Sequence, residues 1–246
     1  MKHGLITLRY DKCLLISRDF RDCFPYYEIF LAREYPLSIR RGDVVLDLGA
    51  HIGFFTVYAA RRAGKVIAVE PLPRNFHNLE VNVRLNKLDN VILVNKAIAQ
   101  RSGYGHLTQD FLSSHLSERG VPCRTTTIDE LLEELGLTPD VVKVDIEGAE
   151  VYCTGSRRLV EAREICVETH GTQDLIENWL RSHNYSCSSY FYSPMRIAKG
   201  VVSNYRTDLP SYKLFLRCLL SLILNPKFPH NHIGNIRIVY GRKNIY

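Results

Sequence analysis

Short apolar runs alternate with longer amphipathic segments through most of this chain. The apolar runs are rich in valine, isoleucine and leucine, as buried strands are, and they occupy residues 44–48, 66–70, 91–95, 141–145 and 164–169. Apolar residues at helical spacing occupy residues 54–63, 74–86, 149–161 and 172–183. Two more strand patterns follow at 185–192 and 235–241. This alternation predicts an α/β fold with a mostly parallel, seven-stranded sheet and helices on both faces.

The first forty residues do not follow this pattern. Residues 4–18 alternate between apolar and polar side chains, which predicts a hairpin or a pair of short strands. Residues 21–35 have a broad apolar side that ends at Pro36, which predicts a helix. We therefore expect an N-terminal cap over residues 1–40, followed by the main domain over residues 41–246.

One stretch of the main domain is irregular. In residues 97–125, Gly103 and Gly105 indicate a hairpin. Regular structure returns at Thr127, which has the spacing of a capping box with Glu130 and predicts the start of a helix.

A second unusual stretch, residues 212–224, is apolar nearly all round. Its polar residues Lys213, Arg217 and Ser221 recur every four positions and form one narrow stripe. Thirteen helical residues span only about 20 Å, which is too short to cross a bilayer. The pattern predicts a helical insertion near residues 205–230. A helix buried against the sheet or against a second subunit, a substrate lid and a contact with a membrane surface all remain open.

Composition sets broad limits on the class of protein. The apolar content of 46% and the charged content of 24% are ordinary for a globular protein. The net charge of +6 is mildly basic, and its arginines stand in scattered pairs. The seven cysteines never form a Cys-x-x-Cys pair, which argues against a disulfide framework or a zinc site. With no signal-peptide pattern at the start, we expect a cytoplasmic protein.

A glycine-rich turn follows the first strand of the main domain. It reads Asp47-Leu48-Gly49-Ala50-His51-Ile52-Gly53, and glycines at such a turn let a ligand approach the backbone. The second strand ends at Glu70, 21 residues after Gly49, where a Rossmann-like sheet holds the two hydroxyls of a ribose. The turn lacks the third glycine of dinucleotide-binding proteins, and Asp47 would repel a phosphate. These features favour S-adenosyl-L-methionine, which is a cationic nucleoside without phosphates.

Further motifs follow the turn in a recognisable order. They are Glu70-Pro71-Leu72-Pro73, Leu79–Asn86, Asn95-Lys96-Ala97-Ile98, Thr127–Leu131, the block Lys143-Val144-Asp145-Ile146-Glu147-Gly148-Ala149-Glu150, and Val167-Glu168-Thr169-His170. On these residues, the chain from about Asp43 to His170 resembles the FkbM family of S-adenosylmethionine-dependent methyltransferases. The resemblance implies a class I Rossmann-like fold and methyl transfer to a hydroxyl oxygen, often on a sugar, glycolipid or polyketide. His51 stands where the family more often has Asn.

Ligands of open α/β sheets bind beyond the carboxyl ends of the strands, so residues that end successive strands should converge on the cofactor. We expect the backbone of the turn to hold the methionine part, Glu70 to bind the ribose, and the residues after Glu70 to form a wall for the adenine. The backbone after the third strand would read the edge of the adenine. The predicted cofactor-binding residues are Asp47, Gly49, Ala50, His51, Gly53, Glu70, Pro71, Leu72, Asn95, Lys96, Ala97 and Asp145.

Methyl transfer to a hydroxyl needs a base that removes the proton of the acceptor. His170 is the first candidate, because an imidazole titrates near neutrality. Asp145 is the second candidate, and it could instead orient the acceptor or the cofactor. Lys143 shares a strand face with Asp145 and could pair with it, and Glu147 could bind an acceptor hydroxyl. Asp145, Glu147, Glu168 and His170 could also hold a divalent cation, but the spacing does not require one and no metal site is predicted.

Other functions remain as alternatives. An RNA methyltransferase fits the mild basicity, although the acidic Asp145-Ile146-Glu147 segment would repel phosphates, so we expect no nucleic-acid partner. A non-catalytic binding module on the same scaffold is the third hypothesis. The expected partner is a small-molecule, glycan or lipid-linked acceptor, and a peripheral membrane contact is compatible with the apolar segment.

Overall fold

The computed structural model describes residues 6–10, 13–17, 24–26, 29–30, 35–108, 116–191 and 236–244. Its centre is a seven-stranded sheet in the order β12-β13-β11-β10-β3-β4-β5. The strands are β3 (Val44–Leu48), β4 (Lys65–Val69), β5 (Val91–Val94), β10 (Val141–Val144), β11 (Glu164–His170), β12 (Tyr185–Phe191) and β13 (Ile236–Lys243). Every pairing is parallel except those of β13, which runs antiparallel to β11 and β12. The predicted mostly parallel, seven-stranded sheet is confirmed, with each predicted strand in place.

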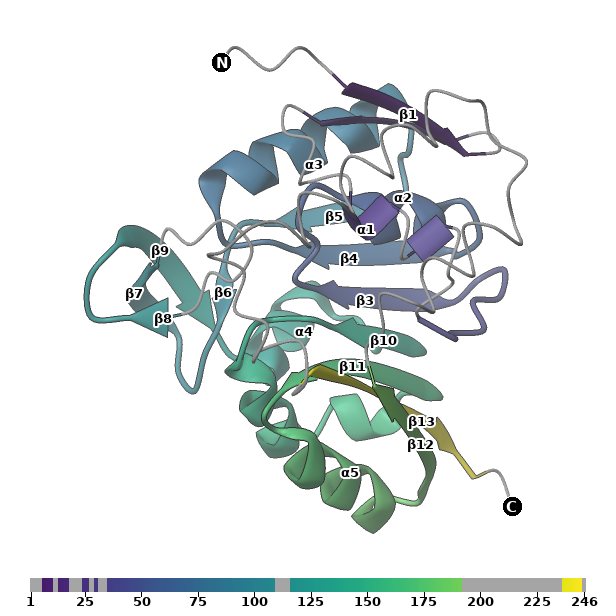
Figure 1. Ribbon diagram of the computed structural model, residues 1–246, viewed down its shortest axis with the longest axis vertical. Coiled ribbons are helices and arrows are strands. Elements are labelled where there is room, and N and C mark those ends of the chain that lie inside the picture. The colour runs from purple at the N-terminus through teal and green to yellow at the C-terminus, as the bar shows by residue number, and fades with distance from the viewer. Residues whose placement is uncertain are drawn as a thin grey trace.

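Helices cover both faces of this sheet (Figure 1). On one face, α2 (Phe54–Ala60) and α3 (Pro73–Leu85) pack on the strands, and α4 (Ile128–Leu135) and α5 (Gln173–Ser182) cover the other. Alternate residues of one strand serve the two layers, since Val45 packs with Phe54 whereas Leu46 packs with Leu132. This period of two is how a parallel strand buried on both faces supplies two apolar cores.

The predicted helix over residues 149–161 is wrong. The chain forms two short 3₁₀ segments there, η3 (Ala149–Gly155) and η4 (Leu159–Glu161). The Asp129 carboxylate of α4 accepts hydrogen bonds from the Ser156 hydroxyl, at 2.5 Å, and from the backbone N–H groups of Arg157 and Arg158. These N–H groups are therefore withdrawn from a continuous helical ladder, and the segment turns at that point.

Most of the stretch that the sequence indicates as irregular, residues 97–125, belongs to a separate four-stranded sheet. Its order is β6-β9-β7-β8, and its strands are β6 (Ala97–Ile98), β7 (Gly103–Leu107), β8 (Leu116–Ser117) and β9 (Val121–Thr126). Gly103 and Gly105 lie within β7 and pair with β9, so they do not form a turn. The capping box at α4 is confirmed, because the Thr127 side chain accepts from the Glu130 N–H and the Glu130 side chain accepts from the Thr127 N–H.

The predicted N-terminal hairpin is present as the antiparallel strands β1 (Ile6–Tyr10) and β2 (Cys13–Ser17). Asn82 of α3 and Asn86, which follows that helix, hold the hairpin, since their side chains accept the N–H groups of Ile16 and Leu14. Of the helix expected over 21–35, α1 (Phe24–Tyr26) is helical, and most of the remaining segment lies outside the described residues. The boundary of a cap at residue 40 stays a prediction.

The predicted insertion near 205–230, with its apolar helix at 212–224, also lies outside the described residues. Among the residues that are described, no helix combines the length and the apolar character that a bilayer crossing requires.

Candidate functional site

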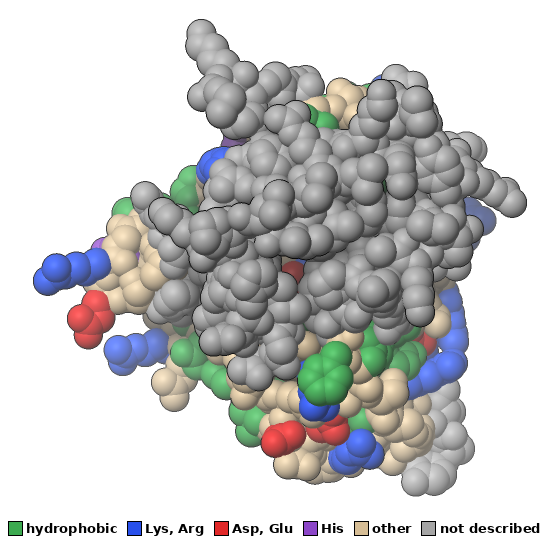
Figure 2. Space-filling view, in the orientation of Figure 1, with side chains coloured by type: hydrophobic (Ala, Val, Ile, Leu, Met, Phe, Trp, Pro, Cys, Tyr) green, Lys and Arg blue, Asp and Glu red, His purple; other side chains and the backbone are tan. Residues whose placement is uncertain are grey.

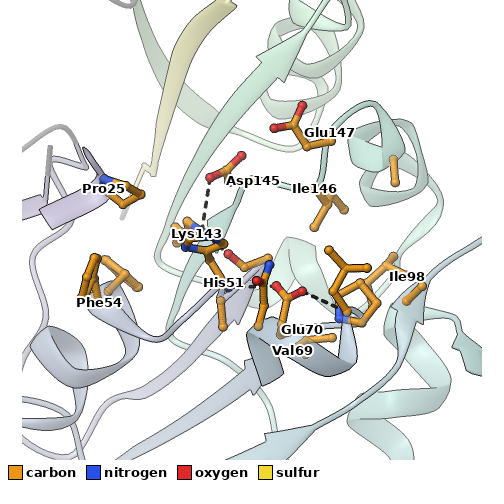
Figure 3. Close-up of a pocket in the computed structure, with 18 of the residues that line it drawn as sticks. Pro25, His51, Phe54, Val69, Glu70, Ile98, Lys143, Asp145, Ile146 and Glu147 are labelled. Carbon is orange, nitrogen blue, oxygen red and sulfur yellow. Dashed lines mark hydrogen bonds and ion pairs between the residues drawn. The ribbon is translucent and has the colours of Figure 1, made fainter. Parts of the chain in front are cut away.

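A pocket opens at the carboxyl ends of β3, β4 and β10. The order of the strands reverses beside β3, and open α/β sheets bind their ligands at such a switch point. The glycine turn, the end of β4 and the segment after β10 bring polar groups into this pocket, and apolar side chains come from α2 and from β6 of the small sheet (Figure 3). The sequence-predicted residues that line it are Gly49, Ala50, His51, Glu70, Pro71, Leu72, Lys96, Ala97, Lys143, Asp145 and Glu147.

Gly49 is required by the close approach of two strand ends. Its φ of +79° lies in the left-handed region, and a Cβ at this position would stand 1.8 Å from the carbonyl oxygen of Asp145. The N–H groups of Gly49 and Ala50 both donate to the carbonyl oxygen of Val69, at 3.0 and 2.9 Å. These two N–H groups therefore connect β3 to β4. The sequence predicts instead that they face the cofactor.

Glu70 is fixed by the backbone on both sides. One carboxylate oxygen accepts the N–H of His51 at 2.9 Å, and the other accepts the N–H of Leu72 at 3.0 Å. The Asn75 side chain also hydrogen-bonds to this carboxylate, so a ligand that uses both oxygens would compete with Asn75 for one of them. Burial raises the pKa of Glu70 to about 7, although the two backbone N–H groups oppose this shift. Asn95 supports the same element, because its amide donates to the carbonyl oxygens of Glu70 and Pro71.

Lys143 joins the glycine turn to the segment after β10. Its ammonium donates to the carbonyl oxygen of Gly49 at 2.7 Å and lies 3.3 Å from Asp47 and 3.6 Å from Asp145. Burial alone would lower the pKa of Lys143, but the surrounding carboxylates, Asp47 first, raise it above its usual value. The pairing of Lys143 with Asp145 agrees with the sequence interpretation. Asp47 itself is fully buried beneath the pocket and accepts the Thr56 hydroxyl at 2.6 Å.

His170 lies among carboxylates behind the pocket. Its Nδ1 is 2.9 Å from Glu150, and its Nε2 is 3.3 Å from Glu147 and 3.9 Å from Glu168. Burial opposes a charge on the ring, but the hydrogen bond with Glu150 and the other carboxylates outweigh it and raise the pKa of His170 to about 10. The ring is therefore an imidazolium at neutral pH. This differs from the sequence expectation of an imidazole that titrates near neutrality.

Glu147 has both strained backbone and a shifted pKa. Its φ of +49° is uncommon for a residue with a side chain, and Gly148 continues the turn with a φ of +93°. Burial raises the pKa of Glu147 to about 7, while the nearby His170 opposes this shift. The carboxylate lines the pocket beside Asp145 (Figure 3). A carboxylate with this pKa accepts protons near neutrality.

Tyr35 was missed by sequence reasoning. Its hydroxyl donates to Glu168 at 3.0 Å and to Asp145 at 3.4 Å, and its ring faces the Lys143 ammonium at 5.5 Å. These partners are more than 100 positions away along the chain, so no local pattern marks this tyrosine.

Three of the strand-end residues could hold a divalent cation. Ligand atoms of Asp145, Glu168 and His170 lie within 4.8 Å of one another. In this arrangement Tyr35 and Lys143 already contact the carboxylates, and His170 carries a proton that a metal would have to displace.

Comparison with known proteins agrees with this geometry. A family model described as the methyltransferase FkbM domain matches residues 47–187. The chain is 26% identical over 225 residues to the AMB antimetabolite synthetase AmbE of Pseudomonas aeruginosa, a match that covers 67% of this chain and 11% of AmbE. It is 38% identical over 94 residues to the tRNA(Phe) (4-demethylwyosine(37)-C(7)) aminocarboxypropyltransferase of Methanocaldococcus jannaschii, covering 32% of this chain and 38% of that protein. The chain thus spans less than half the length of either relative.

A solved structure supports the fold assignment. The crystal structure of the methyltransferase FkbM from Methylobacillus flagellatus KT matches with a TM-score of 0.52 and 18% identity, over 69% of this chain and 45% of that one. At this identity the likeness shows the shared class I fold, which confirms the fold class expected from the sequence.

Proposed function

We propose an O-methyltransferase activity for this chain, which belongs to the FkbM-domain family of S-adenosylmethionine-dependent methyltransferases. The acceptor would be a hydroxyl group of a sugar, a glycolipid or a natural product. The observation that carries the proposal is a single pocket that places Glu70 and the glycine turn opposite Asp145 and Glu147. The side with Glu70 suits a nucleoside, and the side with Asp145 and Glu147 suits acceptance of a proton from the acceptor hydroxyl.

The residues present fit S-adenosylmethionine, which when bound supplies an electrophilic methyl group. Glu70 would hold the two ribose hydroxyls in place of its present hydrogen bond with the Asn75 side chain, and Pro71, Leu72 and Ile98 would form an apolar wall for the adenine. Asp145, which lies 3.6 Å from Lys143, has a carboxylate that suits the cationic methionine part. The carboxylates also disfavour ligands with phosphates, such as dinucleotides.

We assign the base to Glu147, with Asp145 as the alternative. The acceptor hydroxyl must lose its proton as the new C–O bond forms, and Glu147 has a pKa near the pH at which it would work. His170 would stay protonated and hold Glu147 in position from 3.3 Å. This revises the order of the sequence-based candidates, in which His170 came first.

Transfer to RNA is the second candidate, and the match to the tRNA-modifying enzyme of M. jannaschii is the observation in its favour. The acceptor side of the pocket opposes it. Asp145 and Glu147 line this side, and the phosphates of a nucleic-acid backbone would meet their carboxylates there. We therefore favour an acceptor without phosphates near the reacting hydroxyl.

The test is methyl transfer by the purified chain to extracts of small molecules, glycolipids and RNA. With S-adenosylmethionine carrying a labelled methyl group, we expect label in the hydroxyl-bearing fractions and a mass increase of one methylene in one species. The Glu147→Gln variant should lose this transfer, and a Glu118→Gln control, which changes an exposed carboxylate on the small sheet, should retain it. Label found only in RNA would reject the proposal in favour of the second candidate.

A further inference from the structure

The amino ends of the strands form the edge of the sheet opposite the pocket, and this edge carries a cluster of cations. The chain enters β3 and β4 at this edge, and α2 and α3 both end there. Three segments form the cluster, residues 40–42, 61–65 and 84–89. Their cationic side chains, all exposed, are Arg40, Arg41, Arg61, Arg62, Lys65, Arg84 and Lys87, and we call this set the basic edge.

Hydrogen bonds hold the three segments side by side. The N–H groups of Gly64 and Lys65 both donate to the carbonyl oxygen of Asp43, at 2.9 and 3.0 Å. The Asn90 amide donates to the carbonyl oxygens of Ala60 and Ala63, and the Arg61 guanidinium reaches the carbonyl oxygen of Asn86 at 3.3 Å. The cations therefore lie on one continuous surface whose segments are connected by hydrogen bonds.

Acidic side chains barely offset this charge. Within the three segments Asp89 is the one carboxylate, and the neighbouring Asp43 is buried in an ion pair with Arg163 at 2.8 Å. Seven cations against one carboxylate leave a local excess of six positive charges. Two arginine pairs that are separate in the sequence, Arg40-Arg41 and Arg61-Arg62, thus lie in the same cluster.

The other side chains of the basic edge favour a membrane over a nucleic acid. Leu85 is 39% exposed and stands between the cations of Arg84 and Lys87. An exposed leucine among cations suits the boundary between lipid headgroups and acyl chains. The three segments contain no aromatic residue on which a base could stack, and the nearby Tyr58 ring is covered by the Arg62 guanidinium at 3.9 Å.

We propose that the basic edge docks this protein on an anionic lipid surface, with Leu85 entering the interfacial region. Clusters of four to eight lysines and arginines bind anionic lipids in this way. Docking at this edge leaves the pocket at the opposite end of the strands, so binding to lipid does not obstruct it.

The experiment is co-sedimentation of the full chain with vesicles of phosphatidylcholine alone or mixed with phosphatidylglycerol. We expect binding to the mixed vesicles only, and weaker binding at high salt. Reversal of Arg41, Lys65 and Arg84 to Glu should weaken this binding at least about 100-fold. A control that reverses Arg101, Arg119 and Arg124, which are exposed near the small sheet, makes the same change in net charge and should stay within about threefold of the parent. Circular dichroism establishes that both variants are folded.

Each contrary outcome overturns the proposal. If the parent protein does not bind the mixed vesicles, the proposal is wrong. If the control variant loses as much vesicle affinity as the basic-edge variant, binding depends on net charge and not on this surface. The variant Leu85→Ser distinguishes a lipid surface from a nucleic acid as the anionic partner. It should weaken vesicle binding several-fold and leave binding of a single-stranded RNA oligomer unchanged. Tighter binding to the oligomer than to vesicles, lost on reversal of the basic edge, would assign the surface to nucleic acid instead.

Discussion

Replacement of Glu70 by Gln tests the cofactor side of the pocket most directly. Gln keeps the size of the side chain but removes the negative charge and one acceptor oxygen. A hydrogen bond to a charged group contributes about 1.5–3 kcal/mol, and the proposed role of Glu70 is to accept two of them from a ribose. A loss of about 3 kcal/mol corresponds to S-adenosylmethionine binding roughly 100-fold more weakly.

The raised pKa of Glu70 adds a pH dependence with a definite sign. Because burial raises this pKa to about 7 before a ligand binds, the carboxyl is mostly protonated at pH 6 and mostly ionised at pH 8. The ionised form is the one that binds the ribose, so affinity should increase about tenfold from pH 6 to pH 8. The Gln variant should lose this dependence.

Isothermal titration calorimetry of the parent, Glu70→Gln and Glu118→Gln at these two pH values measures both effects. Glu118 lies outside the pocket, so its variant controls for a general change in charge. An affinity of the Gln variant within twofold of the parent would refute the role of Glu70. A pH dependence that persists in the variant would assign the titration to another group.

Three further changes test the rest of the site. Glu147→Gln should slow methyl transfer at least about 100-fold and leave the Kd for S-adenosylmethionine unchanged, and equal rates would remove it as the base. Gly49→Ala should lower the free energy of unfolding in urea by about 2 kcal/mol or more, because its Cβ would meet the Asp145 carbonyl oxygen at 1.8 Å, and an unchanged midpoint would contradict this contact. The pKa of His170 is about 10 when folded and near 6.5 when unfolded, so its stabilisation is complete below pH 6.5 and is lost as pH rises through 10. Comparison of the parent with His170→Gln across this range measures the effect, and parallel stability curves would reject it.

The sequence was sufficient for the sheet because its signals are local. The parallel strands β3, β4, β5 and β10 are short apolar runs, and the capping box at Thr127 lies within four residues. The failed helix over 149–161 shows the limit of such signals. Its apolar spacing is helical, but the carboxylate of Asp129 takes hydrogen bonds from Ser156 and the two residues after it. A contact with another element therefore overrides the local preference.

The site follows the same rule. Glu70, Lys143 and Asp145 line the pocket, as expected from the sequence. Their positions could be predicted because the carboxyl ends of neighbouring parallel strands lie together at one side of the sheet. The sequence did not reveal the protonation of His170, because its pKa depends on four carboxylates that lie around the ring in the folded protein. Tyr35 left no signal at all, since its hydroxyl bonds are made across the sheet.

The two edges of the sheet carry opposite charge, and this links the two proposals. The pocket edge gathers Glu147, Glu150 and Glu168 around one imidazolium, whereas the basic edge holds an excess of six cations. The five residues of β3 alone separate the edges by about 16 Å, which exceeds the Debye length at physiological ionic strength. An anionic surface therefore attracts one edge, while the acidic edge points away from it into solution. In that orientation the acceptor reaches the pocket from the aqueous side, which favours a water-soluble sugar or natural product over a glycolipid of the same membrane.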